Sequence, residues 1–330
     1  MPMKLRMLIV AAGAFLASAG PLVAQAEQRD SPPDVVVEVR GLSCPFCAYG
    51  IEKKFDERAA VDGAGFVYVS DSGNDRIQKF TADGRFVAEW DGTGWSQGLR
   101  RPMHLDLGGD TLLYVPEYTD DRIRLFRLDG TTMATLYEDT VAPGGALDAP
   151  GGAAPSPAGE VWIPDFFNHR VAVYDATEGF RRQVGSAGRW LPGRLHYPTD
   201  VAFGPDGTAY VADAYNHRIQ RFAVDGRRLD GWGGPLGLGV PGPWKGWFNV
   251  ATGIHVDEAG RVYVADFYNH RIQVFGPSGR FRGEWGEAGS EPGAFDRPTD
   301  VATGPDGRIY VADFGNDRVQ VFTCARCGDD

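Results

Sequence analysis

The sequence lacks an excess of basic charge, a long hydrophobic run and the short motifs of several enzyme classes. Its 33 Lys and Arg residues are outnumbered by 44 Asp and Glu residues, which gives a formal net charge of -11. Because nucleic-acid binding depends on clustered cations, we expect no nucleic-acid partner. No segment approaches the roughly 20 apolar residues of a transmembrane helix, so we expect no stable membrane insertion. No Gly-x-Ser-x-Gly, phosphate-loop or HExxH motif indicates an enzyme of those classes.

Cysteine is also scarce, and the four residues form two Cys-x-x-Cys pairs, Cys44 with Cys47 and Cys324 with Cys327. Two neighbouring thiols in an oxidising compartment favour a disulfide or redox couple. Two thiolates also suit a soft metal, so Cu(I) or Zn at Cys44 and Cys47 stays open. The second pair lies in a tail over residues 324–330 and carries less information.

Residues 1–26 have the pattern of a secretory signal peptide. Lys4 and Arg6 precede an apolar segment from Leu8 to Leu16, and the small residues Ala24 and Ala26 flank a cleavage site. We therefore expect an exported protein, periplasmic or extracellular, with a linker over residues 27–34.

One motif, Asp-x-x-Asn-[His/Asp]-Arg, occurs six times with small variations. Its first residues are 46, 48, 48, 53 and 47 positions apart, enough for four short strands and their turns. Six units of this kind can bury their sheet faces only by packing around an axis. The copies begin and end at Asp71 and Arg76, Glu117 and Arg122, Asp165 and Arg170, Asp213 and Arg218, Asp266 and Arg271, and Asp313 and Arg318.

These repeats resemble NHL repeats over roughly residues 56–323. The resemblance implies an all-β fold, a six-bladed β-propeller. It does not imply one function, because propellers of this kind serve as protein-binding, nucleic-acid-binding and occasionally lyase scaffolds. We expect one domain and a monomer. In this arrangement, Trp90, Trp232 and Trp285 are expected to pack between neighbouring blades. The apolar residues just before inner strands are expected to be buried in the core, namely Leu99, Leu195, Phe248 and Phe295.

Two hypotheses compete for residues 35–55. The segment from Val37 to Glu52 resembles the first strand, metal loop and first helix of a heavy-metal-associated domain, although it is too short for the complete domain. Alternatively, Val35 to Arg40 supplies the outer strand that the last repeat lacks. It would then pair antiparallel with Val319 to Phe322 and close the ring, because an unpaired sheet edge is unfavourable.

A residue that recurs in every blade is expected to have a structural role, because a catalytic group is needed once. We assign that role to the Asp and Arg residues of the motifs and to the histidines within them, His169, His217 and His270.

Departures from the repeat are better functional candidates. Alignment of the repeats places His104, Asp200 and Asp300 at one equivalent position, at the start of an inner strand and near the mouth of a central channel. A histidine and two carboxylates could bind a divalent cation or act as acid and base. This cluster would support a metal-dependent lyase or hydrolase, like the amidating lyases and lactonases that such propellers resemble. His255 and His196 align elsewhere.

Four tryptophans lie on loops that run from outer to inner strands, all on the face that carries the motif loops. They are Trp95, Trp190, Trp244 and Trp247. A large rigid indole makes a good contact surface. The preferred hypothesis is therefore a protein- or peptide-binding scaffold that uses this face. An enzyme at the channel mouth and a soft-metal or redox protein at Cys44 and Cys47 are the alternatives.

Overall fold

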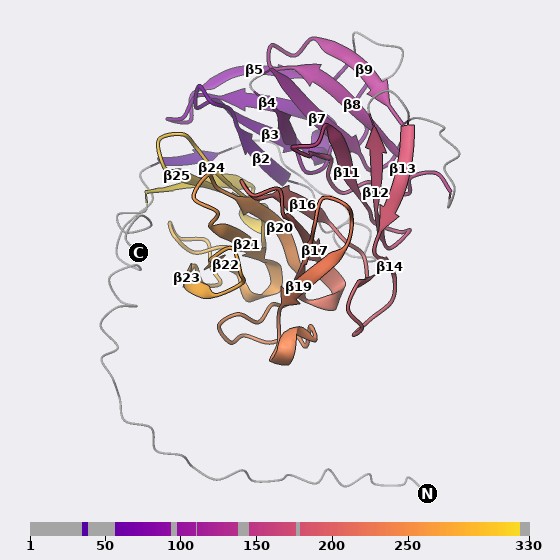
Figure 1. The fold of residues 1–330 in the computed structure, drawn as a ribbon. Helices are drawn as coiled ribbons and strands as arrows, with labels where there is room; N and C mark the ends of the chain where they lie inside the picture. The colour runs from indigo at the N-terminus through magenta and orange to yellow at the C-terminus, as the bar shows by residue number, and fades with distance from the viewer. Residues whose placement is uncertain are drawn as a thin grey trace, which may run out of the picture.

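The computed structural model describes residues 35–38, 57–93, 98–109, 111–137, 145–175 and 179–323. They form six four-stranded antiparallel sheets, the blades, arranged around an axis (Figure 1). A separate two-stranded parallel pair joins β14 (Ser186–Ala187) and β15 (Arg194–Leu195). No helix among these residues is both long and apolar enough to span a membrane.

Each blade is ordered from an inner strand at the axis to an outer strand at the rim. Blade one consists of β2 (Glu57–Val61), β3 (Val67–Asp71), β4 (Arg76–Phe80) and β5 (Phe86–Trp90); blade two of β6 (Asp106–Gly108), β7 (Leu112–Glu117), β8 (Arg122–Arg127) and β9 (Thr132–Leu136); blade three of β10 (Ala154–Pro155), β11 (Glu160–Asp165), β12 (Arg170–Asp175) and β13 (Gly179–Val184).

The second half of the chain repeats this order. Blade four consists of β16 (Asp200–Phe203), β17 (Ala209–Asp213), β18 (Arg218–Phe222) and β19 (Arg228–Trp232); blade five of β20 (Ala251–Val256), β21 (Val262–Asp266), β22 (Arg271–Phe275) and β23 (Phe281–Trp285); blade six of β24 (Pro298–Thr303), β25 (Arg308–Asp313), β26 (Arg318–Thr323) and β1 (Val35–Glu38).

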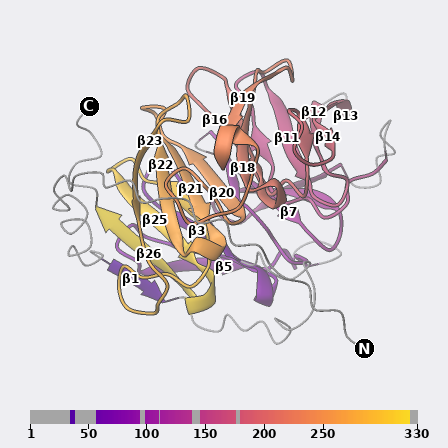
Figure 2. The ribbon, with the colours of Figure 1, turned by 90° about the horizontal axis from the view of Figure 1, so that it is seen from below.

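Blade six is completed by the N-terminal strand β1. It pairs antiparallel with β26, with Val35 opposite Val321 and Val37 opposite Val319. Figure 2 shows β1, in indigo, beside β26, in yellow. The expected ring closure is therefore present, and the residues that resemble the first strand of a heavy-metal-associated domain overlap a strand of the propeller instead.

The core consists of apolar clusters between neighbouring blades. One cluster joins blades one and two, and equivalent clusters join each following pair, ending with the contact between blades six and one. Trp232 packs in this way against Phe275 of the next blade, with ring centroids 5.3 Å apart. The apolar residues before the inner strands are buried as expected, from Leu99 to Phe295. Because every blade face is shared with a neighbour, no blade needs a core of its own.

Two parts of the ring depart from the regular blade pattern. Blade three has an inner strand of only two residues, β10. The connection from β19 to β20 is long and contains the short 3₁₀ turn η4 (Pro235–Gly237). It extends beyond the strands of its blade in Figure 1, where it is orange.

Candidate functional site

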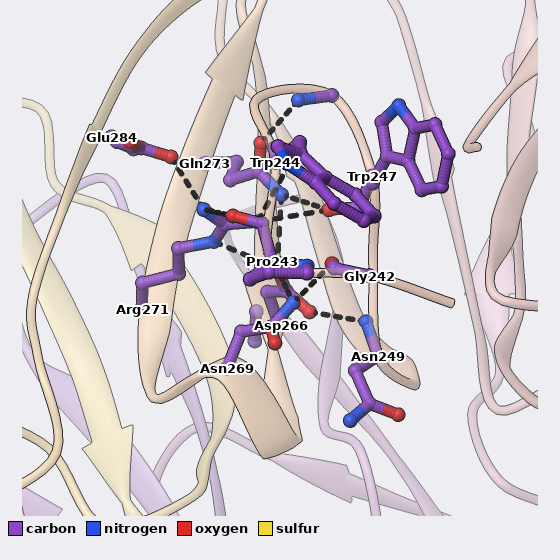
Figure 3. A network of polar contacts seen from close by, with 12 residues as sticks. Gly242, Pro243, Trp244, Trp247, Asn249, Asp266, Asn269, Arg271, Gln273 and Glu284 are labelled. Atoms are coloured by element: carbon purple, nitrogen blue, oxygen red, sulfur yellow. Dashed lines mark hydrogen bonds and ion pairs between the residues drawn. The ribbon is translucent and has the colours of Figure 1, made fainter. Parts of the chain in front are cut away.

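Each repeat motif forms a buried polar network around its carboxylate. In blade five, Asp266 accepts hydrogen bonds from Arg271 Nε at 2.8 Å and Gln273 Nε2 at 2.9 Å (Figure 3). It also accepts from Asn269 Nδ2 at 2.8 Å and from the Asn249 amide at 2.7 Å. Burial raises the pKa of Asp266, and the nearby Arg271 opposes that shift. The carboxylate thus links two strands to the preceding loop.

The other five motifs contain the same pair, with Nε to carboxylate distances between 2.5 and 2.8 Å. Such charge-assisted bonds are among the stronger hydrogen bonds of proteins. These contacts support a structural role for the motif residues. The pairs are Asp71 with Arg76, Glu117 with Arg122, Asp165 with Arg170, Asp213 with Arg218, and Asp313 with Arg318.

The fifth motif residue connects neighbouring blades. His169 Nδ1 accepts the amide hydrogen of Tyr197 at 3.0 Å, and His217 Nδ1 accepts that of Val250 at 3.1 Å. Asp75 plays the same part for the amide of Arg101 at 2.7 Å. Equivalent bonds join Asp121 to Ala149 and His270 to Arg297. All five donor residues have positive φ angles, from 51 to 68°, so each bond stabilises a left-handed conformation that costs energy in a non-glycine residue.

Arg271 also fixes the loop that carries two candidate tryptophans. Its Nη1 donates to the carbonyl oxygen of Pro243 at 2.7 Å, and its Nη2 donates to those of Trp244 and Trp247 at 3.0 Å each (Figure 3). The two indole rings meet edge to face, with centroids 4.6 Å apart. A buried guanidinium therefore holds the loop backbone at three carbonyls behind these side chains.

Blade four repeats this arrangement around Trp190. Arg218 Nη1 donates to the carbonyl oxygen of Trp190 at 3.2 Å, and Nη2 donates to that of Leu191 at 2.9 Å. The Trp190 side chain is 54% exposed and that of Trp244 is 60% exposed. Their backbones are fixed while their side chains are accessible. Trp247 is partly buried, and Trp95 lies outside the described residues.

The loop between β19 and β20 also lies directly against the blade-four motif. A Cβ atom added at Gly239, where φ is +74°, would lie 1.8 Å from the carbonyl oxygen of Asn216. The same loop exposes Leu236 and Leu238, and Leu191 of the preceding loop is exposed as well. We call the side chains of Trp190, Leu191, Leu236, Leu238 and Trp244 the loop surface.

The predicted channel residues come together. His104 Nδ1 lies 3.4 Å from Asp200 Oδ2 and 3.5 Å from Asp300 Oδ2, and all three side chains are buried. They are the one group of three or more His, Cys, Asp or Glu ligand atoms, among the described residues, that are close enough to share a metal ion. They come from blades two, four and six, and we call them the axial trio.

Backbone amides hold both carboxylates of the axial trio. Asp200 accepts from Val201 at 2.8 Å and, across the blade boundary, from Ile254 at 2.8 Å. Asp300 accepts from Val301 at 2.9 Å and from Ala59 of blade one at 3.2 Å. The carboxylates thus join blades as well as facing His104.

Two further ionisable groups lie two positions along the inner strands. Asp106 has a pKa raised to about 7 by burial and by the nearby Asp300 carboxylate. His255 has a pKa lowered by burial, and its Nε2 lies 2.7 Å from Thr303 Oγ1. The sequence analysis did not select Asp106. Its alignment with His255, a second ionisable residue at the same repeat position, could have identified it. His196 lies apart from this group and stacks on His169, with centroids 5.2 Å apart.

An aromatic cluster lies among the motif loops. It gathers the residue after the motif carboxylate from several blades, including Phe166, Phe267 and Phe314, together with Met103. Sequence reasoning missed this cluster, although an aromatic residue at that motif position in four blades was a signal.

Comparison with known proteins identifies the repeats. Residues 195–222, 248–275 and 295–322 match the family model of the NHL repeat, and these segments coincide with the first three strands of blades four, five and six. The fold is a six-bladed β-propeller of NHL repeats. No curated protein matches the chain in sequence.

Solved structures share this propeller at low identity. A streptogramin B lyase is 16% identical with a TM-score of 0.56, and the match covers 80% of this chain and 77% of that one. A catalytically inactive virginiamycin B lyase from Staphylococcus aureus, solved with quinupristin, is 16% identical with a TM-score of 0.56, covering 84% and 87%. A Bacteroides thetaiotaomicron protein of unknown function is 14% identical with a TM-score of 0.65, covering 82% and 69%. At these identities the likeness establishes the fold alone.

Some predictions concern residues outside those that the structure describes. They include the signal peptide over 1–26, the linker, and both cysteine pairs, Cys44 with Cys47 and Cys324 with Cys327. The comparisons give no support for the heavy-metal-associated resemblance. Copper or zinc binding at Cys44 and Cys47 stays a prediction.

Proposed function

We propose that this NHL propeller is a protein-binding scaffold whose loop surface binds an acidic peptide segment of a partner. The observation that carries the proposal is the pair of exposed tryptophans, Trp190 and Trp244, on loops fixed from behind by Arg218 and Arg271. Exposed indoles on a fixed backbone lose little conformational freedom on binding. Buried aromatic anchors of this kind commonly dominate interface energies, each contributing about 2 kcal/mol or more.

The charge of the two loops indicates the chemistry of the partner. Residues 185–199 and 233–250 contain no Asp or Glu, although the whole chain has 44. They contain Arg189, Arg194 and Lys245, whose side chains are exposed. The equivalent loop before blade six instead contains Glu287 and Glu291. A partner segment with acidic residues beside apolar ones would complement this surface.

Selection from a random peptide library tests this proposal and needs no identified partner. We expect peptides selected on the wild-type protein to be enriched in Asp or Glu next to aromatic or aliphatic residues. Their affinity should fall at least 10-fold for the Trp190→Ala/Trp244→Ala variant, as expected when buried anchors are lost. The matched control is Phe86→Ala, which removes an exposed aromatic side chain from blade one.

The control variant should bind the selected peptides like the wild type. The proposal is wrong if no peptide is enriched, if the enriched peptides are basic, or if the tryptophan variant binds them with unchanged affinity.

A metal-dependent lyase or hydrolase is a second candidate, favoured by the buried axial trio. A lyase solved with quinupristin shares the fold, so quinupristin is a reasonable first substrate. This candidate predicts that the protein converts quinupristin in a metal-dependent manner, measured by mass spectrometry, and that His104→Ala abolishes the conversion. Conversion that persists in His104→Ala would contradict it, as would no conversion with any divalent metal.

A further inference from the structure

We infer that the axial trio of His104, Asp200 and Asp300 binds one small divalent transition-metal ion such as Zn²⁺ on the propeller axis. The ligand atoms are His104 Nδ1 and one oxygen from each carboxylate. Imidazole and carboxylate ligands suit zinc, and three protein ligands leave a position for water or another molecule. This inference is independent of the loop surface, which lies on other residues.

The two distances from His104 Nδ1 to the carboxylates match those between ligands of one metal ion better than those of charge-assisted hydrogen bonds. Zn–N and Zn–O bonds of about 2.0–2.2 Å in tetrahedral geometry place neighbouring ligand atoms about 3.3–3.6 Å apart. His104 Nδ1 lies 3.4 and 3.5 Å from the two Oδ2 atoms. A hydrogen bond between a charged nitrogen and a carboxylate is usually about 2.7–2.9 Å long. All three ligand atoms lie within 4.8 Å of one another.

Backbone amides orient the carboxylates independently of a metal ion. Each oxygen of Asp200 accepts one amide hydrogen, from Val201 or from Ile254. A carboxylate oxygen has more than one acceptor direction, so these bonds leave lone pairs for a cation. Hydrogen bonds to the ligand from outside the coordination sphere are a regular feature of protein metal sites, because they fix the ligand geometry.

Of the six equivalent inner-strand positions, three hold the ligands and two hold glycine. Blades three and five have Gly152 and Gly253 at this position. A Cβ atom at Gly253 would lie 2.5 Å from Asp300 Oδ1, and one at Gly152 would lie 3.2 Å from Asp200 Oδ1. Glycine therefore admits the carboxylates of the adjacent blades. The sixth position is Arg58, of whose side chain the structure describes nothing.

Zinc binding to the purified protein tests the inference directly. The variant background is Cys44→Ser/Cys47→Ser/Cys324→Ser/Cys327→Ser, so that no thiolate can contribute. We expect one Zn²⁺ per chain by elemental analysis and titration calorimetry, and an affinity at least 100-fold lower for His104→Ala. The matched control is His255→Gln, which changes another inner-strand histidine and should leave zinc affinity within about 3-fold.

A second readout does not depend on a variant that folds well. Co²⁺ can replace Zn²⁺, and its visible absorption bands are more intense in a four-coordinate than in a six-coordinate site. We expect the four-serine protein to show the more intense bands with one Co²⁺ bound per chain. Zinc should also raise the melting temperature of the four-serine protein and of its His255→Gln variant, but not of its His104→Ala variant.

The inference is overturned if the four-serine protein binds no stoichiometric zinc or cobalt. That result would show that the three side chains do not form a metal site. It is also overturned if folded His104→Ala binds zinc with the affinity of the wild type.

Discussion

The Nδ1 atom of His217 in blade four accepts a hydrogen bond of 3.1 Å from the backbone amide of Val250, in the connection that leads into blade five. An imidazole can accept at Nδ1 only while that nitrogen carries no proton. Burial, Arg189 and His196 lower the pKa of His217 to about 4. Asp75 and Asp121 perform the same task in other blades, which explains why the motif accepts either residue.

This bond predicts a loss of stability in mild acid. Below the ordinary His pKa of 6.5, the unfolded chain binds a proton at His217 that the folded chain binds only near pH 4. The free energy of unfolding should therefore fall between about pH 6.5 and 4. The full pKa shift corresponds to roughly 3 kcal/mol, which solvent screening of this partly exposed ring reduces to about 2 kcal/mol. Urea unfolding across this range measures the effect.

The matched variant is His217→Asn, because Asn tolerates the left-handed conformation and its side-chain oxygen can accept the same amide. This variant should show a shallower pH dependence than the wild type over the same range. An unchanged slope would contradict the role given to His217.

Replacement of the motif arginine tests the structural role of the repeat motif. Arg271→Ala leaves the buried Asp266 carboxylate without its cation and releases the carbonyls of the Trp244 loop. We expect the free energy of unfolding to fall by about 3–5 kcal/mol. The control Arg85→Ala removes an exposed pair with Asp83 and should cost less than about 1 kcal/mol. Equal losses in the two variants would show that the buried network stabilises the fold no more than a surface pair does.

Substitution of Gly253 tests the packing around the axial trio, and Gly283 provides a matched control. Gly253→Ala would place a Cβ atom 2.5 Å from Asp300 Oδ1, whereas a Cβ atom at Gly283 would meet nothing within 4 Å. We expect Gly253→Ala to lower the free energy of unfolding by about 2 kcal/mol and Gly283→Ala to leave it nearly unchanged. Similar stabilities for both variants, measured by urea unfolding, would contradict the packing described for the axial trio.

The basic character of the two tryptophan loops predicts electrostatic dependence of partner binding. Arg189→Glu/Lys245→Glu should weaken binding of the selected acidic peptides at least 10-fold, and added salt should weaken binding to the wild type. Arg127→Glu changes an exposed arginine in blade two, outside these loops, and should have little effect. Calorimetry at two salt concentrations provides the measurement, and insensitivity to both charge and salt would exclude an acidic partner.

Much of the architecture could be predicted from the sequence because the repeats specify it locally. Six motif copies predicted six blades, and the missing outer strand of the last repeat predicted the pairing of β1 with β26. The equivalence of His104, Asp200 and Asp300 also followed from alignment, because ring symmetry brings equivalent positions to the same axis.

Other features depend on side-chain directions that a repeat pattern does not contain. The sequence analysis predicted the same binding role for Trp244 and Trp247. In the structure, Trp244 is exposed, whereas Trp247 is partly buried and packs against it. The amide of Val250 that donates to His217 occupies the same repeat position as the donors in other blades. The repeat pattern alone does not show that the fifth motif side chain points toward this amide. Asp106 was overlooked because alanine occupies the equivalent position in most of the other blades.

Hydroxyl-radical footprinting of the protein with and without a selected acidic peptide tests the central claim most directly. Exposed Trp190 and Trp244 should be oxidised readily in the free protein and protected at least several-fold when the peptide binds. Phe86 and Met133, which are exposed on other blades, should show unchanged oxidation. Protection of Phe86 or Met133 with Trp190 and Trp244 still oxidised at the free rate would place the binding site elsewhere and contradict the account.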